Sequence, residues 1–262
     1  MSTLSYAARD SATMLKRNLR YSVRYPATVI VSLAIPALLL LLFVGVFGGA
    51  LGAGLGAAPP GGKYIDYVLP GILLMSIGYG ASSTTLAVNR DMTEGIMARF
   101  RTMAISRSSV LTGHVVAALI RTLASTVLLV AVALLMGYRS GADAGRWLAA
   151  AGLVTLLTFA LSWLAVAIGL SAPTAEGTVG FTLIVQLLPF ISSAFVPTGS
   201  MSAGVGWFAH NQPFTPVIDT LRGLLAGTPT GHSAIIAVAW CAGLAVFGYL
   251  WAGALFRKGS AR

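Results

Sequence analysis

Residues 67–89 read YVLPGILLMSIGYGASSTTLAVN, and residues 90–103 continue the chain as RDMTEGIMARFRTM. The first stretch carries no charged side chain and is long enough for an α-helix to cross the hydrocarbon core of a bilayer, which takes about 20 residues. The second stretch is rich in charges. The boundary near Asn89 therefore predicts the end of a membrane span and the start of a segment in water.

The composition of the whole chain agrees with a membrane protein. Of the 262 residues, 56% are hydrophobic and 9% are charged, whereas about 25% are charged in a soluble domain. So few charges cannot cover the surface of a water-soluble fold, and the excess apolar surface must face lipid. The single cysteine, Cys241, excludes an intrachain disulfide and a multi-cysteine metal site.

Six apolar stretches are long enough to span a membrane, and they predict an all-α, polytopic membrane protein whose residues 1–262 form a single transmembrane domain. Backbone polar groups at membrane depth must pair within their own segment, and a helix satisfies this requirement. The predicted spans are residues 27–50, 67–89, 109–137, 148–171, 178–197 and 233–256.

The distribution of basic residues predicts the orientation of these spans. Of the 17 Lys and Arg residues, five precede the first span, four lie between the second and third spans, and three follow the last. Against these twelve, the segments on the other side carry four, namely Lys63, Arg139, Arg146 and Arg222. Because cytoplasmic segments are enriched in Lys and Arg, we expect a multi-pass protein with both termini in the cytoplasm.

The segment before the first span, residues 1–26, has a helical pattern of its own. Apolar residues recur at spacings of three, four and seven, and Arg17, Arg20 and Arg24 form a basic stripe. Anionic lipid headgroups attract such a stripe. The pattern predicts an interfacial helix, and the alternative is a basic flank without a defined structure.

The outer loop, residues 198–232, also has signals for short helices. Thr215 and Pro216 form an N-cap and first-turn pair, and the apolar face that follows ends at Gly227. A similar start at Ser202 predicts a partner helix. These helices either dip back into the membrane or lie on its surface, and we favour the re-entrant arrangement.

The segment 91–103 has a more distinctive pattern. Met92, Ile96, Phe100 and Met103 recur at spacings of four, four and three, so a short helix here would present one apolar stripe flanked by charges. Such a helix either rests on the bilayer or inserts its apolar stripe into a groove on a partner protein.

Within the spans, Arg121 and several small residues need an explanation. A charge at the centre of the bilayer costs about 2.5–3.5 kcal/mol, so we expect Arg121 to reach the cytoplasmic interface rather than to contact a substrate. The hydroxyl side chains near residue 83 are expected to bond neighbouring helices. Gly45 and Gly49 are four residues apart, which favours close packing of two helices as much as a flexible end of the first span.

Two parts of the chain resemble one known family. The runs YVLPGILLMSIGYG (67–80) and NRDMTEGIMARFRTMAISRSSVLTGHVVAALIRTL (89–123) resemble the second span and following helix of ATP-binding-cassette (ABC) type-2 exporter permeases. FVPTGSM (195–201) and NQPFTPVIDTLRGLLAG (211–227) resemble the outer loop of the daunorubicin-resistance permease branch.

The resemblance implies a transmembrane permease subunit in the inner membrane of a bacterium, with a role in multidrug efflux and antibiotic resistance. Such permeases form a homodimer and pair with two copies of a separate ABC ATPase, which binds ATP and Mg, so no cofactor is expected in this chain. The cargo implied is a hydrophobic or amphipathic, drug-like or lipid-like compound. The helix 91–103 resembles the coupling helix that contacts the ATPase, which makes the candidate coupling residues Asp91, Glu94, Gly95, Ile96, Met97, Arg99, Phe100, Arg101 and Met103.

Candidate cargo contacts lie on the spans that, in this family, face each other across the dimer axis. Flat amphipathic molecules stack on aromatic rings, and a polar group in a span either lines a path or bonds a neighbouring helix. The candidate residues are Phe43, Phe47, Tyr79, Phe181, Gln186, Phe190 and Phe195.

Other classes of function have little support in the sequence. The stretch ending at Gly61, Gly62 and Lys63 lacks the first glycine and the Ser or Thr of a phosphate-binding loop. We find no catalytic residues, no metal-ligand spacing and no nucleic-acid signature. A dimeric secondary carrier or channel and a lipid-processing membrane enzyme remain as alternatives, and the carrier is disfavoured because no carboxylate lies at membrane depth.

Overall fold

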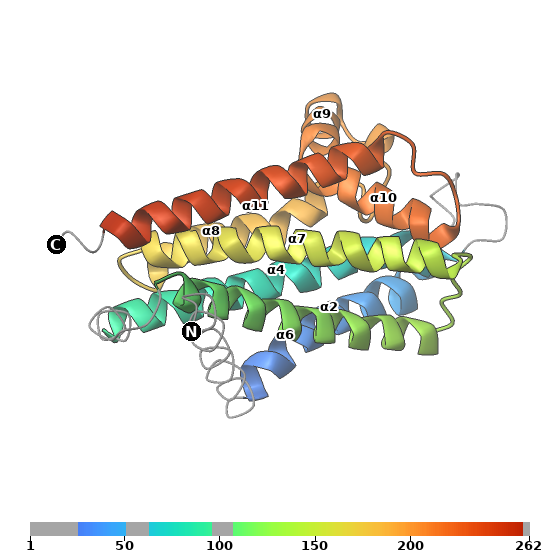
Figure 1. The fold of residues 1–262 in the computed structure, drawn as a ribbon. Coiled ribbons are helices and arrows are strands. Elements are labelled where there is room, and N and C mark those ends of the chain that lie inside the picture. The colour runs from blue at the N-terminus through green and yellow to red at the C-terminus, as the bar shows by residue number, and fades with distance from the viewer. Residues whose placement is uncertain (1–25, 51–62, 96–106, 259–262) are drawn as a thin grey trace.

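Helix α4 (Tyr64–Thr93) runs unbroken through the stretch quoted above. In the computed structural model, which describes residues 26–50, 63–95 and 107–258, α4 lies inside a bundle of helices (Figure 1). Asp66 starts the helix by accepting a hydrogen bond from the backbone N–H of Lys63 at 3.0 Å. Gly95, with φ +71°, follows its last turn in the left-handed conformation that favours glycine. The second span is thus longer than the predicted 67–89 at both ends.

The described residues form an all-α, polytopic membrane protein, as the composition predicts. Four of the described helices, α4, α6, α7 and α11, are long and apolar enough to cross a membrane. Two shorter apolar segments, 33–46 and 176–191, occupy the places of the predicted first and fifth spans. The bounds are α2 (Pro26–Leu41), the π-helical turn η1 (Leu42–Val46), α6 (Arg107–Leu135), α7 (Ala144–Ser171) and α11 (Ser233–Lys258).

The fifth apolar segment is shorter than the predicted 178–197. It consists of η2 (Glu176–Thr178), α8 (Val179–Leu187) and η3 (Leu188–Ile191). Pro189 has no backbone N–H to continue the helix, and Ser192 then turns the chain: its hydroxyl donates to the Pro189 carbonyl and accepts the N–H of Ala194. The chain leaves the helix six residues before the predicted end.

The outer loop contains η4 (Thr198–Ser200), α9 (Ala203–Asn211) and α10 (Phe214–Ala226). Ser202 precedes α9 as predicted, but the prediction that Thr215 caps the second helix is wrong. Helix α10 already begins at Phe214, and the Thr215 hydroxyl donates to the Ala209 carbonyl. Most of α10 is buried against α4, α7 and α11, whereas α9 is largely exposed. Only the second helix therefore turns back into the bundle.

Helix α7 lies at the centre of the bundle, between α11 and α6 in Figure 1. A Cβ at Gly169 would lie 2.7 Å from the Thr85 carbonyl oxygen of α4, and a Cβ at Gly248 would lie 2.7 Å from the Leu164 nitrogen of α7. These glycines allow the backbones to approach closely. By contrast, nothing lies within 4 Å of a Cβ at Gly45 or Gly49, so the described part of this chain does not show the predicted close packing there.

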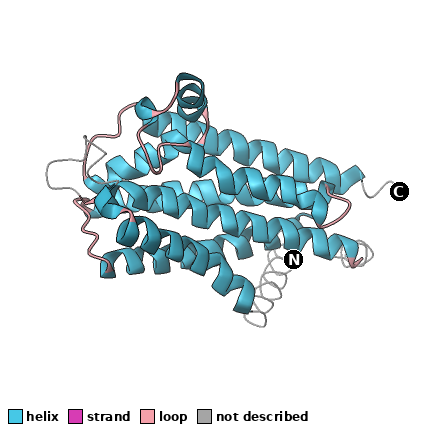
Figure 2. Ribbon diagram, turned by 180° about the vertical axis from the view of Figure 1, so that it is seen from behind, coloured by secondary structure: helices cyan, strands magenta, loops and turns pink. Residues whose placement is uncertain are grey.

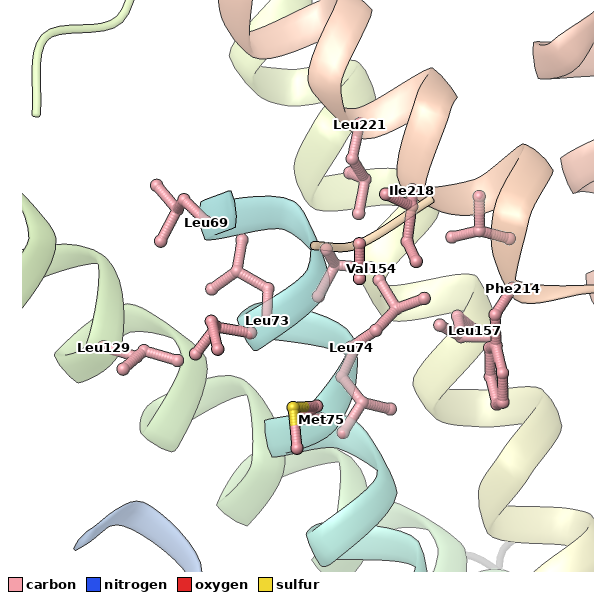
Figure 3. Packing of buried hydrophobic residues seen from close by; sticks show 14 of the residues in the cluster. Leu69, Leu73, Leu74, Met75, Leu129, Val154, Leu157, Phe214, Ile218 and Leu221 are labelled. Carbon is pink, nitrogen blue, oxygen red and sulfur yellow. The ribbon is translucent and has the colours of Figure 1, made fainter. Parts of the chain in front are cut away.

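The main hydrophobic cluster joins the second span to the outer loop. Figure 3 shows Ile218 and Leu221 of α10 together with Leu74 of α4 and Leu157 of α7. All four side chains are fully or almost fully buried. Figure 2 shows the same bundle from behind, with the loops at its two ends. Apolar contacts therefore fix α10 in place at one end of the bundle.

Candidate functional site

Asp91 lies in the last turn of α4 and contacts His114 of α6. The carboxylate Oδ2 is 3.2 Å from His114 Nε2, and the two side chains are 14% and 6% exposed. The neighbouring pair of Arg90 and Glu94 is about half exposed, and such surface pairs contribute little to stability. The buried contact of Asp91 therefore fixes the end of α4 against α6.

The structure places only part of the predicted coupling segment. Asp91 belongs to α4 rather than to a separate helix 91–103, and Glu94 and Gly95 form the turn that ends α4. The candidate coupling residues that fall outside the described residues are Ile96, Met97, Arg99, Phe100, Arg101 and Met103. Their role in coupling stays a prediction.

Four of the predicted cargo-contact aromatics form one cluster, which we call the aromatic cluster. Phe43 in η1 lies 4.4 Å from Phe195, measured between ring centroids, and Phe195 lies 5.1 Å from Phe190 in η3. Phe47 extends the row at 6.0 Å from Phe43. Phe47 and Phe190 are 42% and 40% exposed, so the cluster joins the ends of the first and fifth apolar segments and remains accessible.

The other three candidates lie elsewhere on α4 and α8. Phe181 of α8 is buried in the main hydrophobic cluster, while Tyr79 of α4 and Gln186 of α8 are partly buried. Among the described residues, no ring contact joins Tyr79 or Phe181 to the aromatic cluster. Phe181 and Phe195 both belong to the main hydrophobic cluster, so Phe181 contributes to core packing.

Apolar side chains remain exposed on both segments that carry the aromatic cluster. Helix α2 packs against α4 and α6, and α8 packs against α4, but both leave apolar side chains exposed in a single copy of the chain. The residues that are at least 40% exposed include Leu38, Leu41, Leu42 and Val46 on α2 and η1, and Leu183, Ile184, Leu187 and Ile191 on α8 and η3. Lipid or a second protein surface must cover them.

Arg222 of α10 forms a polar junction that the sequence analysis did not find. Its guanidinium donates to the Tyr67 carbonyl at 3.2 Å, to the Ser193 carbonyl at 2.6 Å and to the Asp219 carboxylate at 2.8 Å. It also lies 3.9 Å from the centroid of the Tyr67 ring, and the Ser193 hydroxyl donates to Asp219 at 2.7 Å. One side chain thus ties α10 to α4 and to the turn after η3.

Arg121 lies near the middle of α6 and bonds to α4. Its guanidinium donates to the Ser83 hydroxyl at 3.1 Å and to the Thr84 hydroxyl at 3.0 Å. At Gly80, a Cβ would lie 2.2 Å from the Thr122 hydroxyl oxygen, so the two helices are in close contact here. Ser83 and Thr84 thus bond a neighbouring helix as expected, whereas Thr85 donates to the Ala81 carbonyl of its own helix. Arg121 is held against α4 by these bonds, rather than extended to the interface as expected.

Comparison of the sequence with known protein families identifies one family. Residues 10–226 match the ABC-2 type transporter family. The daunorubicin resistance ABC transporter permease protein DrrB1 of Streptomyces coeruleorubidus is 28% identical over 170 residues, which are 63% of this chain and 59% of that protein.

The probable doxorubicin resistance ABC transporter permease protein DrrC of Mycobacterium tuberculosis is 24% identical over 179 residues, 68% of this chain and 65% of that protein. The chain therefore spans somewhat less than two thirds of the length of either relative. The family match covers most of the chain, and the chain belongs to the ABC-2 type transporter family.

Proposed function

We propose that this chain is the permease subunit of an ATP-driven exporter, and that α4 transmits movement from the ATPase to the outer end of the bundle. This 30-residue helix carries Asp91 at one end and bonds to Arg222 through Tyr67 near the other. A helix of this length spans about 45 Å. Because packed elements move as rigid bodies, a displacement at Glu94 is expected to reach α10.

The partners of this permease are two copies of an ABC ATPase and a second copy of the chain. Family membership supports a separate ATPase, which would hold ATP and Mg. The exposed apolar residues of α2 and α8 support contact with a second permease copy, since that contact would cover them. The aromatic cluster would then lie close to the junction of the two copies.

The proposed cargo is a hydrophobic or amphipathic compound, drug-like or lipid-like, that leaves the cytoplasm or the inner leaflet. The names of the two relatives refer to resistance to daunorubicin and to doxorubicin. The accessible rings of Phe47 and Phe190 would offer stacking surfaces to such a molecule. The excess of basic residues supports an orientation with both termini in the cytoplasm of a bacterial cell.

A charge reversal at Glu94 tests the coupling assignment. Glu94 is exposed at the end of α4, and Asp143, exposed at the opposite end of the bundle, provides a matched control. We expect Glu94→Arg to weaken co-purification of the full chain with its cognate ATPase at least about tenfold, since like charges across an interface cost several kcal/mol. Asp143→Arg should leave co-purification unchanged.

Equal co-purification of both variants would contradict the coupling role of this end of α4. A second measurement distinguishes the exporter from the carrier. If liposomes that contain the chain without an ATPase show gradient-driven flux of cargo, the chain is a secondary carrier; if flux requires the ATPase and ATP, the proposal stands.

A further inference from the structure

A cavity of about 450 Å³ lies between α4, α6, α7 and α10, away from the aromatic cluster. Leu73 of α4, Val154 of α7 and Leu221 of α10 form part of its wall, and Figure 3 shows these three side chains close together. On the opposite side, Val127 of α6 is 68% exposed, and Ala151 of α7 is also exposed. The cavity therefore opens between α6 and α7 to the outside of the bundle.

The wall of this cavity is apolar. Its two hydroxyl groups donate within their own helices, Thr126 to the Thr122 carbonyl and Thr155 to the Ala151 carbonyl. A buried water needs two to four polar partners, and the wall offers few. Helices α6 and α7 are both candidate spans, so the open side of the cavity faces the hydrocarbon core of the bilayer. A lipid acyl chain can therefore enter the cavity from the bilayer.

Basic side chains lie near the turn between α6 and α7, at the end of the cavity that Trp147 lines. Lys63 Nζ lies 3.4 Å from the Gly137 carbonyl oxygen, Arg139 follows in the same turn, and Arg146 precedes Trp147 in the first turn of α7. Asp143, 70% exposed, lies 3.7 Å from Arg146. Lys has three donors and Arg has five, so each cation keeps donors for a further anion after its contacts in the chain.

We propose that this cavity holds one acyl chain of a phospholipid whose phosphate lies among Lys63, Arg139 and Arg146. The wall and the acyl chain are both apolar, and the three cations are opposite in charge to the phosphate. Trp147 lies between the two regions, at the depth where tryptophan is enriched in membrane proteins. The lipid comes from the leaflet that meets the α6–α7 turn, which is the outer leaflet in the orientation proposed above.

The test uses the full chain in nanodiscs of equal parts phosphatidylglycerol and phosphatidylcholine, with a phosphatidylglycerol probe that carries a photoreactive group on its acyl chain. Cross-links are expected in the stretches 123–130 and 147–155. Ala151→Phe should lower them about tenfold, the loss expected when two or more methylene groups lose their apolar contacts. Ala149→Phe is the matched control, because Ala149 is exposed on the same helix and does not line the cavity.

A second variant tests the charges. Arg146→Gln should lower the preference for phosphatidylglycerol over phosphatidylcholine about fivefold, since one basic residue near an anionic surface has an effect of this size. Circular dichroism and gel filtration check that each variant keeps its fold.

The other outcomes overturn the proposal. Equal cross-linking of Ala151→Phe and Ala149→Phe, or equal cross-linking along the exposed side of α11, would show only the general lipid shell. Displacement of the probe by a transported drug, together with loss of export in Ala151→Phe, would make the cavity a cargo site. Since the lipid test needs no ATPase, it can fail while the proposed export function stands.

Discussion

Arg222 shows how much of the outer architecture depends on one side chain. Its three acceptors belong to α4, to the turn after η3 and to α10 itself. The planar guanidinium reaches them in different directions, whereas the ammonium of lysine is a compact charge without that fork. The side chain is 20% exposed, so its hydrogen bonds are poorly replaced by water.

We therefore expect Arg222→Lys to destabilise the purified chain by about 2 kcal/mol, the cost of losing hydrogen bonds to a charged group. Thermal unfolding in detergent should show a fall in Tm of about 4–8 °C for a chain of this size. Arg139→Lys is the control, because Arg139 is exposed and bonds only to carbonyls near it in the chain. Equal Tm values for the two variants would argue against the junction.

At the scale of elements, Gly169 sets the distance between α7 and α4. A Cβ there would lie 2.7 Å from the Thr85 carbonyl oxygen, which belongs to the backbone and cannot rotate away. Asn89 of α4 also donates to the Ala172 carbonyl at 2.7 Å, just after α7 ends. The two helices are thus held together by contacts that leave no room for a methyl group.

Gly169→Ala is expected to lower the stability by about 1–3 kcal/mol, the usual cost of overpacking. Gly152→Ala on the same helix is the matched control, because nothing lies within 4 Å of its Cβ. That substitution should be neutral or stabilise by up to about 1 kcal/mol, since alanine restricts the unfolded chain. Differential scanning fluorimetry on both variants measures the difference, and a destabilised Gly152→Ala beside an unchanged Gly169→Ala would contradict the packing described here.

Much of the element layout is predictable from the sequence, because apolar length alone marks the spans that became α4, α6, α7 and α11. The end of the fifth segment was missed, since the turn at Ser192 depends on hydroxyl bonds that leave no signature in hydropathy. The start of α10 was misplaced by the strong local signal of Thr215, whose hydroxyl is used in a tertiary contact.

The candidate site was predicted less completely than the fold. The sequence identifies aromatic residues on the spans, but tertiary packing decides which four of their rings come into contact. Asp219 and Arg222 are three residues apart on a predicted helix, a spacing that favours an ion pair. That spacing is a local signal for the Arg222 junction. No local signal marks the contacts of Ser193 with α10 or of His114 with Asp91, because each joins segments far apart in sequence.

At the scale of the whole molecule, the proposed orientation makes the two ends of α11 differ in accessibility. His232 lies just before the helix and Arg257 near its end, and both are exposed. In a Cys241→Ala background, an impermeant thiol reagent added to intact cells should label His232→Cys and not Arg257→Cys. Permeabilised cells should show labelling of both. The reverse pattern in intact cells would invert the proposed topology, and with it the placement of Glu94 beside the ATPase.

The π-helical turn η1 allows the hydrogen-bond register of the first apolar segment to shift by one residue. In it the Phe47 N–H donates to the Leu42 carbonyl five residues back, at 3.2 Å, so the turn holds one residue more than an α-helical turn. Each residue advances an α-helix by about 100°. If this turn relaxed to α-helical geometry, Phe47 would rotate by about 100° about the helix axis. Its ring would then leave the aromatic cluster. A single slip in hydrogen-bond register would thus remove the tilted contact between Phe47 and Phe43, with no hinge in the backbone required.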